Sequence, residues 1–375
     1  MRTTHLVAIA ALALAAAGCG TAPNAPNEAA GNSKPLPGAV LKSIQIGPDV
    51  EQRILALNPE HISEEDVRDT LSKAPAPRVY GIHGGVYPVE LLMRSFGRFL
   101  TGMGYPEKRI RDAGDNSWSY SPYGSGAEQA GEIAWYYEHE GMRPLLVGHS
   151  QGGIQVVKIL HELAGSFGDN PQVFNPLTRQ FENRTTIVDP LTGEERPVIG
   201  LSVAYASVVG TGGWSLALPV HWAVASRIRT IPDTVDDFTG YRIGIDFFAM
   251  DAPGFENLKT FHANGKANVR NVTLPAEYSH VFVPATADLA KDPAMKTWIN
   301  AFDPNDEAHR APLPNPNASN VLWAADVWYG IKKHWCIELQ RLIQAQRASA
   351  AQSHAPRSMA APSGPDIAVR RPGIG

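Results

Sequence analysis

The sequence is poor in cysteine: Cys19 and Cys336 are the only two in 375 residues. A pair this small does not provide the disulfide framework that stabilises many exported proteins. Cys336 falls in an apolar helical pattern and is interpreted as a small buried hydrophobe rather than a reactive thiol. The chain also lacks a His-x-x-x-His sequence and a closely spaced cysteine pair. We therefore expect no metal site and no cofactor.

The sequence also lacks an excess of basic residues. It has 33 Lys and Arg against 37 Asp and Glu, a formal net charge of -4, and no basic stripe. A nucleic-acid partner is therefore not expected. The hydrophobic fraction of 43% and the charged fraction of 19% are ordinary for a globular protein with a sizeable core.

The apolar run near the N-terminus is too short to cross a bilayer as a mature helix. It covers the twelve residues 6–17, follows Arg2, and ends in Ala16-Ala17-Gly18-Cys19. This pattern is typical of a signal peptide over residues 1–18, and its ending resembles the bacterial lipobox. The resemblance implies that Cys19 is lipidated and that the protein is exported and anchored to the bacterial cell envelope, at the outer membrane or the periplasmic face. An ordinary secretory signal with an incidental cysteine is the alternative.

The composition divides the remaining chain into a tether, a folded domain and a tail. Residues 19–40 are rich in Pro, Asn, Ala and Gly and predict a flexible tether. The folded domain is expected over residues 41–346. The Ala, Ser, Pro and Arg content of residues 347–375 predicts a disordered tail.

Within the domain, apolar strand patterns alternate with helical patterns. Strand patterns occur over 78–82, 144–148, 199–209, 238–245 and 269–274, with a further strand-like stretch over 108–111. Helical patterns occur over 89–100, 124–140, 154–163, 296–302 and 321–346. This alternation predicts an α/β domain in which helices cover a parallel sheet.

Two segments depart from the alternation. Residues 184–198 read as a surface hairpin with a turn at Asp189-Pro190. Residues 213–237 carry two tryptophans among few charges and suggest a mobile cap over an apolar pocket. For residues 214–231, a buried helix of the core is the alternative.

The domain is organised around Gly148-His149-Ser150-Gln151-Gly152, which joins a strand pattern to a helical pattern. A serine at such a sharp turn has a strained backbone, and the glycines two residues away let strand and helix approach each other. The turn exposes Ser150 Oγ as a nucleophile. It also leaves the backbone N–H of Gln151 free to stabilise an oxyanion at the start of the helix.

A second glycine-containing loop, His83-Gly84-Gly85, follows the strand pattern over 78–82. Glycines after a strand let the backbone approach a ligand closely. The N–H of Gly84 or Gly85 is the expected second oxyanion donor. A tight strand-to-helix connection without that role is the alternative.

A serine hydroxyl needs a base to remove its proton, and histidine has a suitable pKa. His280 is the candidate because it lies in a loop after a late strand pattern. A carboxylate behind the histidine fixes its tautomer and stabilises the imidazolium. Asp246 directly follows a strand pattern and is preferred, with Asp251 as the alternative and Asp237 as a weaker one.

The order Ser, Asp, His on alternating α/β elements resembles the α/β-hydrolase superfamily. The resemblance covers roughly residues 78–302, and its sharp motifs are His83-Gly84-Gly85, the Ser150 turn, and Tyr278-Ser279-His280. It implies a mostly parallel sheet flanked by helices, with cap and hairpin insertions. It also implies an esterase- or lipase-like hydrolase that forms an acyl-enzyme on Ser150 and acts on an ester or lipid small molecule.

Two other functions remain open at this point. An acyltransferase or thioesterase on the same fold would use the same residues, and an acceptor pocket beside Ser150 would indicate a transferase. A non-catalytic binding lipoprotein is expected instead if Ser150 and His280 lie far apart.

Overall fold

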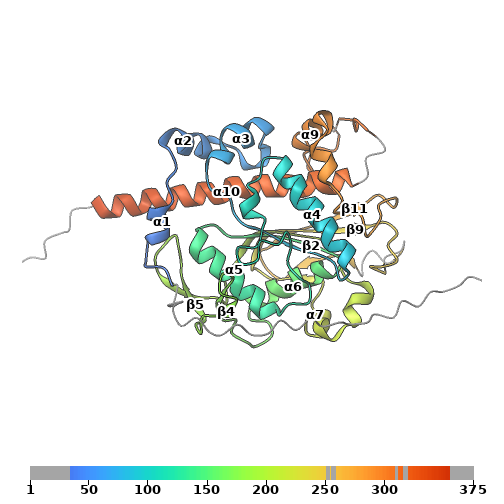
Figure 1. Cartoon of the computed structure of the whole chain (residues 1–375), viewed down its shortest axis with the longest axis horizontal. Coiled ribbons are helices and arrows are strands. Elements are labelled where there is room, and N and C mark those ends of the chain that lie inside the picture. Colours follow the sequence, from blue (N-terminus) through green and yellow to red (C-terminus); the bar gives the residue numbers. More distant parts are fainter. Residues whose placement is uncertain (1–33, 251–253, 255–258, 309–310, 316–319, 355–375) are drawn as a thin grey trace, which may run out of the picture. The chain divides into compact units, whose positions relative to one another are not determined.

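Five strands form the central sheet, in the order β1 (Val79–Ile82), β2 (Leu145–His149), β7 (Val203–Val209), β9 (Val235–Ile243) and β11 (Asn268–Leu274). Each pairing between neighbours in this sheet is parallel. Every residue of β1, β2 and β7 is buried, which explains why these strands read as continuous apolar runs. The predicted α/β class with a parallel sheet is confirmed (Figure 1).

This computed structural model describes residues 34–250, 254, 259–308, 311–315 and 320–354. The predicted signal peptide, Cys19 and Asp251 lie outside the described residues. The described residues group as one compact unit.

Helices cover both faces of the sheet (Figure 1). On one face lie α4 (Tyr87–Gly102) and α10 (Val321–His354), and on the other lie α5 (Gly126–Glu140) and α6 (Gln151–Leu163). The side chains of β2 alternate between the two cores: Leu145 and Val147 join the α4/α10 cluster, whereas Leu146 joins the α5/α6 cluster. This alternation follows from the period of two along a strand.

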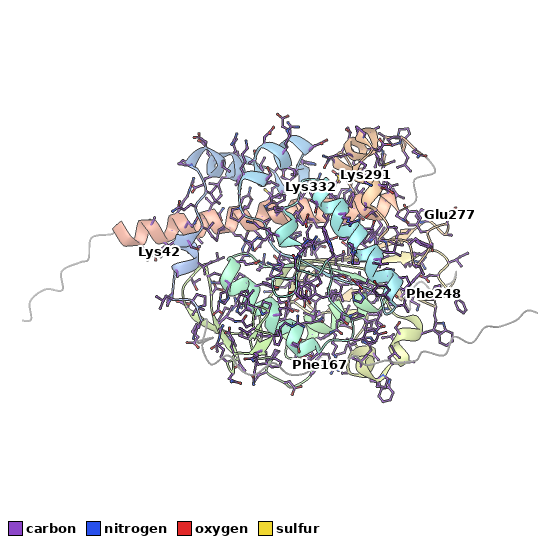
Figure 2. The ribbon with its side chains drawn as sticks, viewed as in Figure 1. Lys42, Phe167, Phe248, Glu277, Lys291 and Lys332 are labelled. Atoms are coloured by element: carbon purple, nitrogen blue, oxygen red, sulfur yellow. The ribbon has the colours of Figure 1, made fainter. Side chains whose placement is uncertain are left out.

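Helix α10 anchors several short elements to its face of the sheet. Its side chains Trp323, Trp328 and Trp335 are fully buried. Lys332 is also buried, and its Nζ donates to the carbonyl oxygens of Ile62 and Asn300, at 2.7 and 2.9 Å (Figure 2). Other helices of the described residues are α1 (Ala39–Ser43), α2 (Pro48–Ala56), α3 (Glu64–Asp69), α7 (Trp222–Ala225) and α9 (Pro293–Asn300). The 3₁₀ helices are η1 (Pro59–His61), η2 (Leu71–Lys73), η3 (Glu107–Arg109), η4 (Gly213–Ala217), η5 (Pro219–His221) and η6 (Ala287–Ala290).

Among the described residues, three small strand pairs lie outside the main sheet. They are β3 (Phe174–Asn175) with β4 (Gln180–Phe181), β5 (Thr186–Val188) with β6 (Glu195–Pro197), and β8 (Thr230–Ile231) with β10 (His262–Ala263). The β5 and β6 strands are antiparallel, which confirms the hairpin predicted over 184–198. Its turn is closed by Asp189, whose side chain accepts the backbone N–H groups of Leu191 and Thr192.

The structure corrects four predictions about elements or their boundaries. The stretch over 108–111 is not a strand, because Pro106 opens η3 and Arg111 pairs with Glu107 one helical turn away. Helix α10 continues through residues 347–354, which were predicted to begin the disordered tail, because their Ala, Gln and Arg content favours helix. The buried helix considered for 214–231 is wrong, since this segment forms η4, η5, α7 and β8. The last residues of the predicted cap, from 235, belong to β9.

Candidate active site

Ser150 lies between the end of β2 and the start of α6. Its backbone has φ 55° and ψ -119°. A positive φ of this kind costs energy for a residue with a Cβ. Two neighbouring glycines make the turn possible: a Cβ on Gly148 would lie 2.6 Å from the Gly152 carbonyl oxygen, and a Cβ on Gly152 would lie 2.5 Å from that of His83. The Ser150 N–H donates to the Val209 carbonyl at 2.8 Å, which fixes the turn to β7.

His280 lies beside Ser150 although 130 residues separate them in the chain. Its Nε2 is 2.8 Å from Ser150 Oγ, and its Nδ1 is 2.6 Å from Asp246 Oδ2. A carboxylate can only accept, so Nδ1 carries the proton and Nε2 is free to accept from the serine hydroxyl. The three side chains meet because β2, β9 and β11 are parallel and their carboxyl ends share one edge of the sheet.

Asp246 is the carboxylate in contact with His280, and its side chain is fully buried. Burial alone would raise the pKa of this carboxyl. The hydrogen bonds from His280 and from the backbone N–H groups of Ala249 and Phe248 outweigh burial and lower the pKa of Asp246. Asp237, the weaker sequence candidate, pairs instead with Lys333 and His334 of α10.

His149 connects the turn at Ser150, which we call the elbow, to the loop that carries His280. It is fully buried, and its Nε2–H donates to the His280 carbonyl oxygen at 2.7 Å. Burial and the neighbouring His280 lower the pKa of His149 to about 3, so its ring is neutral at ordinary pH. The sequence predicted only that His149 packs beside the turn. Nothing in the local sequence marks a hydrogen bond to a residue so far along the chain.

Gly210 determines how closely the imidazole of His280 approaches β7. Its φ is 62°, and a Cβ there would lie 2.8 Å from His280 Nδ1. A side chain at this position would therefore displace the histidine. The sequence analysis missed this role, although a glycine directly after a buried strand is the signal that could have found it.

Two hydrogen bonds hold the Gly84-Gly85 loop beside the elbow. His83 Nδ1–H donates to the Gly84 carbonyl at 2.7 Å, and the Tyr123 hydroxyl donates to the Gly85 carbonyl at 2.6 Å. A Cβ on Gly84 would lie 3.3 Å from Ser150 Cβ, so the loop approaches the serine closely. In a trans peptide the carbonyl and the next N–H point in opposite directions. The bond to His83 therefore orients the N–H of Gly85 as well as the carbonyl of Gly84.

The backbone N–H groups beside Ser150 are available to a ligand. In the part of the chain that the structure describes, no hydrogen-bond acceptor is paired with the N–H of Gln151, Gly84 or Gly85. The Gln151 group belongs to the first turn of α6, where helix N–H groups lack partners within the helix. Gln151 is buried and its carboxamide lies against Gly85: a Cβ on Gly85 would lie 3.1 Å from Gln151 Cδ.

Comparisons with known proteins found no relative that indicates a function, so the functional assignment rests on the geometry of the site. A search against protein-family models found no match, and a search of curated proteins found no match either. Within the described ranges, no group of three or more His, Cys, Asp or Glu side chains could hold a metal ion. Among the same residues, no helix has the length and apolar character needed to cross a membrane.

Proposed function

We propose that the chain is a serine hydrolase that cleaves carboxylic esters. The observation that carries the proposal is the hydrogen-bond relay from Ser150 Oγ to His280 Nε2 at 2.8 Å and from His280 Nδ1 to Asp246 at 2.6 Å. These distances lie in the range in which a base can take a proton from its nucleophile. The strained backbone of Ser150 supports the same reading, because strain of this kind clusters at functional sites.

In the acylation step, Ser150 Oγ attacks the ester carbonyl carbon while its proton moves to His280 Nε2. The carbonyl oxygen becomes an oxyanion and accepts hydrogen bonds from the N–H groups of Gln151 and of Gly84 or Gly85. The C–O bond to the alcohol then breaks, His280 gives its proton to the departing alkoxide, and the acyl group remains on Ser150. Asp246 stabilises the imidazolium that forms between the two proton transfers.

Deacylation repeats the chemistry with water. His280 Nε2 takes a proton from the water as its oxygen attacks the acyl carbon, and the oxyanion forms at the same N–H donors. When the second tetrahedral intermediate collapses, His280 returns the proton to Ser150 Oγ and the carboxylic acid leaves. The overall reaction consumes one ester and one water and requires no cofactor.

The arrangement supports membership of the α/β-hydrolase superfamily. Serine follows β2, aspartate follows β9 and histidine follows β11, in the chain order expected for that fold. On this reading, residues 213–234, which are the predicted cap without its last residues in β9, form a cap, and the β5–β6 hairpin is a surface insertion. We propose in addition that Cys19 is lipidated and that the enzyme is anchored to the bacterial cell envelope.

The geometry of the site argues against one alternative function and is compatible with two others. A non-catalytic binding lipoprotein was expected to separate Ser150 from His280, and the 2.8 Å contact argues against it. An acyltransferase or a thioesterase would use the same relay with another acceptor or leaving group.

The test is hydrolysis of p-nitrophenyl esters with acyl chains from short to long. We expect activity in the wild type and a loss of at least about 10³-fold in Ser150→Ala, with the protein still folded by circular dichroism. A fluorophosphonate probe should label Ser150 in the wild type only. If no ester is hydrolysed and Ser150 is not labelled, the proposed function is wrong.

A further inference from the structure

The edge of the sheet that carries Ser150 also carries most of the exposed large apolar side chains. Fifteen such side chains are exposed among the described residues, and twelve of them lie in segments that follow the carboxyl ends of strands or the bridge residue Tyr120. We call these twelve the apolar rim: Val86, Tyr87, Leu91, Tyr123, Trp214, Leu218, Trp222, Ile245, Phe247, Phe248, Met250 and Phe282. Because the strands of the sheet are parallel, all these segments leave it at the same edge as Ser150.

The rim is continuous with the catalytic relay. Ring centroids lie 6.4 Å apart for Trp214 and Phe247, 6.1 Å apart for Phe247 and Phe248, and 5.2 Å apart for Phe248 and His280. Figure 2 shows Phe248 on the same side of the molecule as Glu277, which precedes His280 by three residues in the chain. An apolar surface that meets the rim therefore lies directly beside the reacting serine.

The rim offers apolar surface with few charges. Residues 203–226 contain no Asp, Glu, Lys or Arg, and in residues 243–250 the only charged side chain is Asp246, which faces His280. Trp222 is 65% exposed, and its indole N–H donates to the Ala217 carbonyl at 3.0 Å. Since this polar group is paired internally, the ring presents only its apolar part to the surroundings.

These features match a lipid surface better than a dissolved molecule. Aromatic side chains, of which the rim has seven, are the groups that favour the boundary between water and hydrocarbon. A patch with few charges offers little recognition of a charged polymer, and an exposed apolar surface on a globular domain marks an interaction site. The segments of the rim leave the sheet at the edge that carries Ser150, and ring contacts join Trp214, Phe247 and Phe248 to His280.

We propose that the apolar rim seats the enzyme on the surface of a water-insoluble ester lipid, from which single molecules enter the site. This inference rests on the proposed function and adds to it the physical state of the substrate. The rim contacts the lipid phase, and the ester group of one molecule reaches Ser150 without leaving the apolar surface. Aggregated ester lipids are therefore the preferred substrates over dissolved esters of the same chemistry.

The experiment measures hydrolysis of tributyrin by the full-length protein, below and above the solubility limit of the ester. We expect the rate to rise steeply once an emulsion forms. In the double variant Trp222→Ser/Phe247→Ser, the ratio of the emulsion rate to the dissolved rate should fall about tenfold, because a large part of the apolar surface is removed. Loss of folded protein lowers both rates equally and leaves this ratio unchanged.

Leu177→Ser is the matched control, because Leu177 is 59% exposed but lies next to β4, away from the rim. Its ratio should equal that of the wild type. Hydrolysis of dissolved tributyrin without a rise in the emulsion overturns the inference and leaves the proposed function intact, as does a rise that the double variant shares in full. Absence of hydrolysis in both states, together with no fluorophosphonate label on Ser150, overturns the proposed function itself.

Discussion

Replacing His149 by phenylalanine tests the link between the elbow and the loop of His280. Phenylalanine keeps a ring of similar size in the fully buried position but removes the Nε2–H donor. The His280 carbonyl, which accepts that hydrogen bond at 2.7 Å, is then left unpaired. An unpaired buried polar group costs about 1–3 kcal/mol, so His149→Phe should be less stable than the wild type by about this amount at pH 7.5.

The difference in stability should depend on pH, because the pKa of His149 is about 3 in the folded protein and ordinary in the unfolded chain. Below pH 6.5 the unfolded chain binds a proton that the folded protein does not bind. The stability of the wild type is therefore complete above this pH and falls as pH decreases toward 3. Linkage gives a loss of about 2 kcal/mol at pH 5 from this one group, and phenylalanine does not titrate. The advantage of the wild type should shrink by that amount or reverse.

Urea unfolding at pH 7.5 and pH 5.0 measures this change in the free energy of unfolding. His61→Gln is the control, since the His61 side chain is 67% exposed and this variant keeps the buried His149 to which the pH-dependent loss is assigned. The value of kcat, measured at pH 7.5, should fall about tenfold in His149→Phe because the His280 loop loses an anchor. An equal stability difference at both pH values would refute the buried neutral state of His149.

Three further predictions concern the relay, the second loop and the buried thiol. Asp246→Asn should lower kcat about 10³- to 10⁴-fold with little loss of stability, measured on p-nitrophenyl butyrate; wild-type kcat in this variant would transfer the role to Asp251. Gly85→Ala should lower kcat about 10- to 100-fold, because its Cβ would overlap the Gln151 carboxamide and displace an oxyanion donor. An unchanged kcat would place the donor elsewhere. The thiol of Cys336 is fully buried and burial raises its pKa to about 12, so mass-spectrometric mapping should find it unmodified by maleimide until urea unfolds the chain.

The sequence was most informative where the cause of a structure is local. The turn at Ser150 needs glycine at positions 148 and 152 because strand and helix backbones touch there, and this requirement is visible within five residues. The α/β class followed from buried strand runs that alternate with helical patterns. Local signals also misled: residues 108–111, Lys-Arg-Ile-Arg, were predicted to be strand-like, but the proline before them and an ion pair one turn apart favour a 3₁₀ helix.

The candidate triad was predictable in kind but only partly in identity. Loops after late strands had to supply a histidine and a carboxylate. The sequence narrowed the histidine to His280 and the carboxylate to Asp246 or Asp251, with Asp237 as a weaker candidate. Which carboxylate meets the imidazole depends on where each loop leaves the sheet, and the structure brings Asp246 to 2.6 Å. No local sequence pattern determines the distance between the Asp246 carboxylate and the His280 ring.

The sequence alone determined the elbow, the parallel α/β architecture and the residue types of the site, because backbone sterics and hydrophobic periodicity act over a few residues. The tertiary structure decided the anchoring of His280 by His149, the anchoring of Gly85 by Tyr123, and the gathering of exposed aromatic side chains around Ser150. Each of these joins segments that are distant in the chain. Such contacts depend on strand order and register, which arise only when the whole core packs.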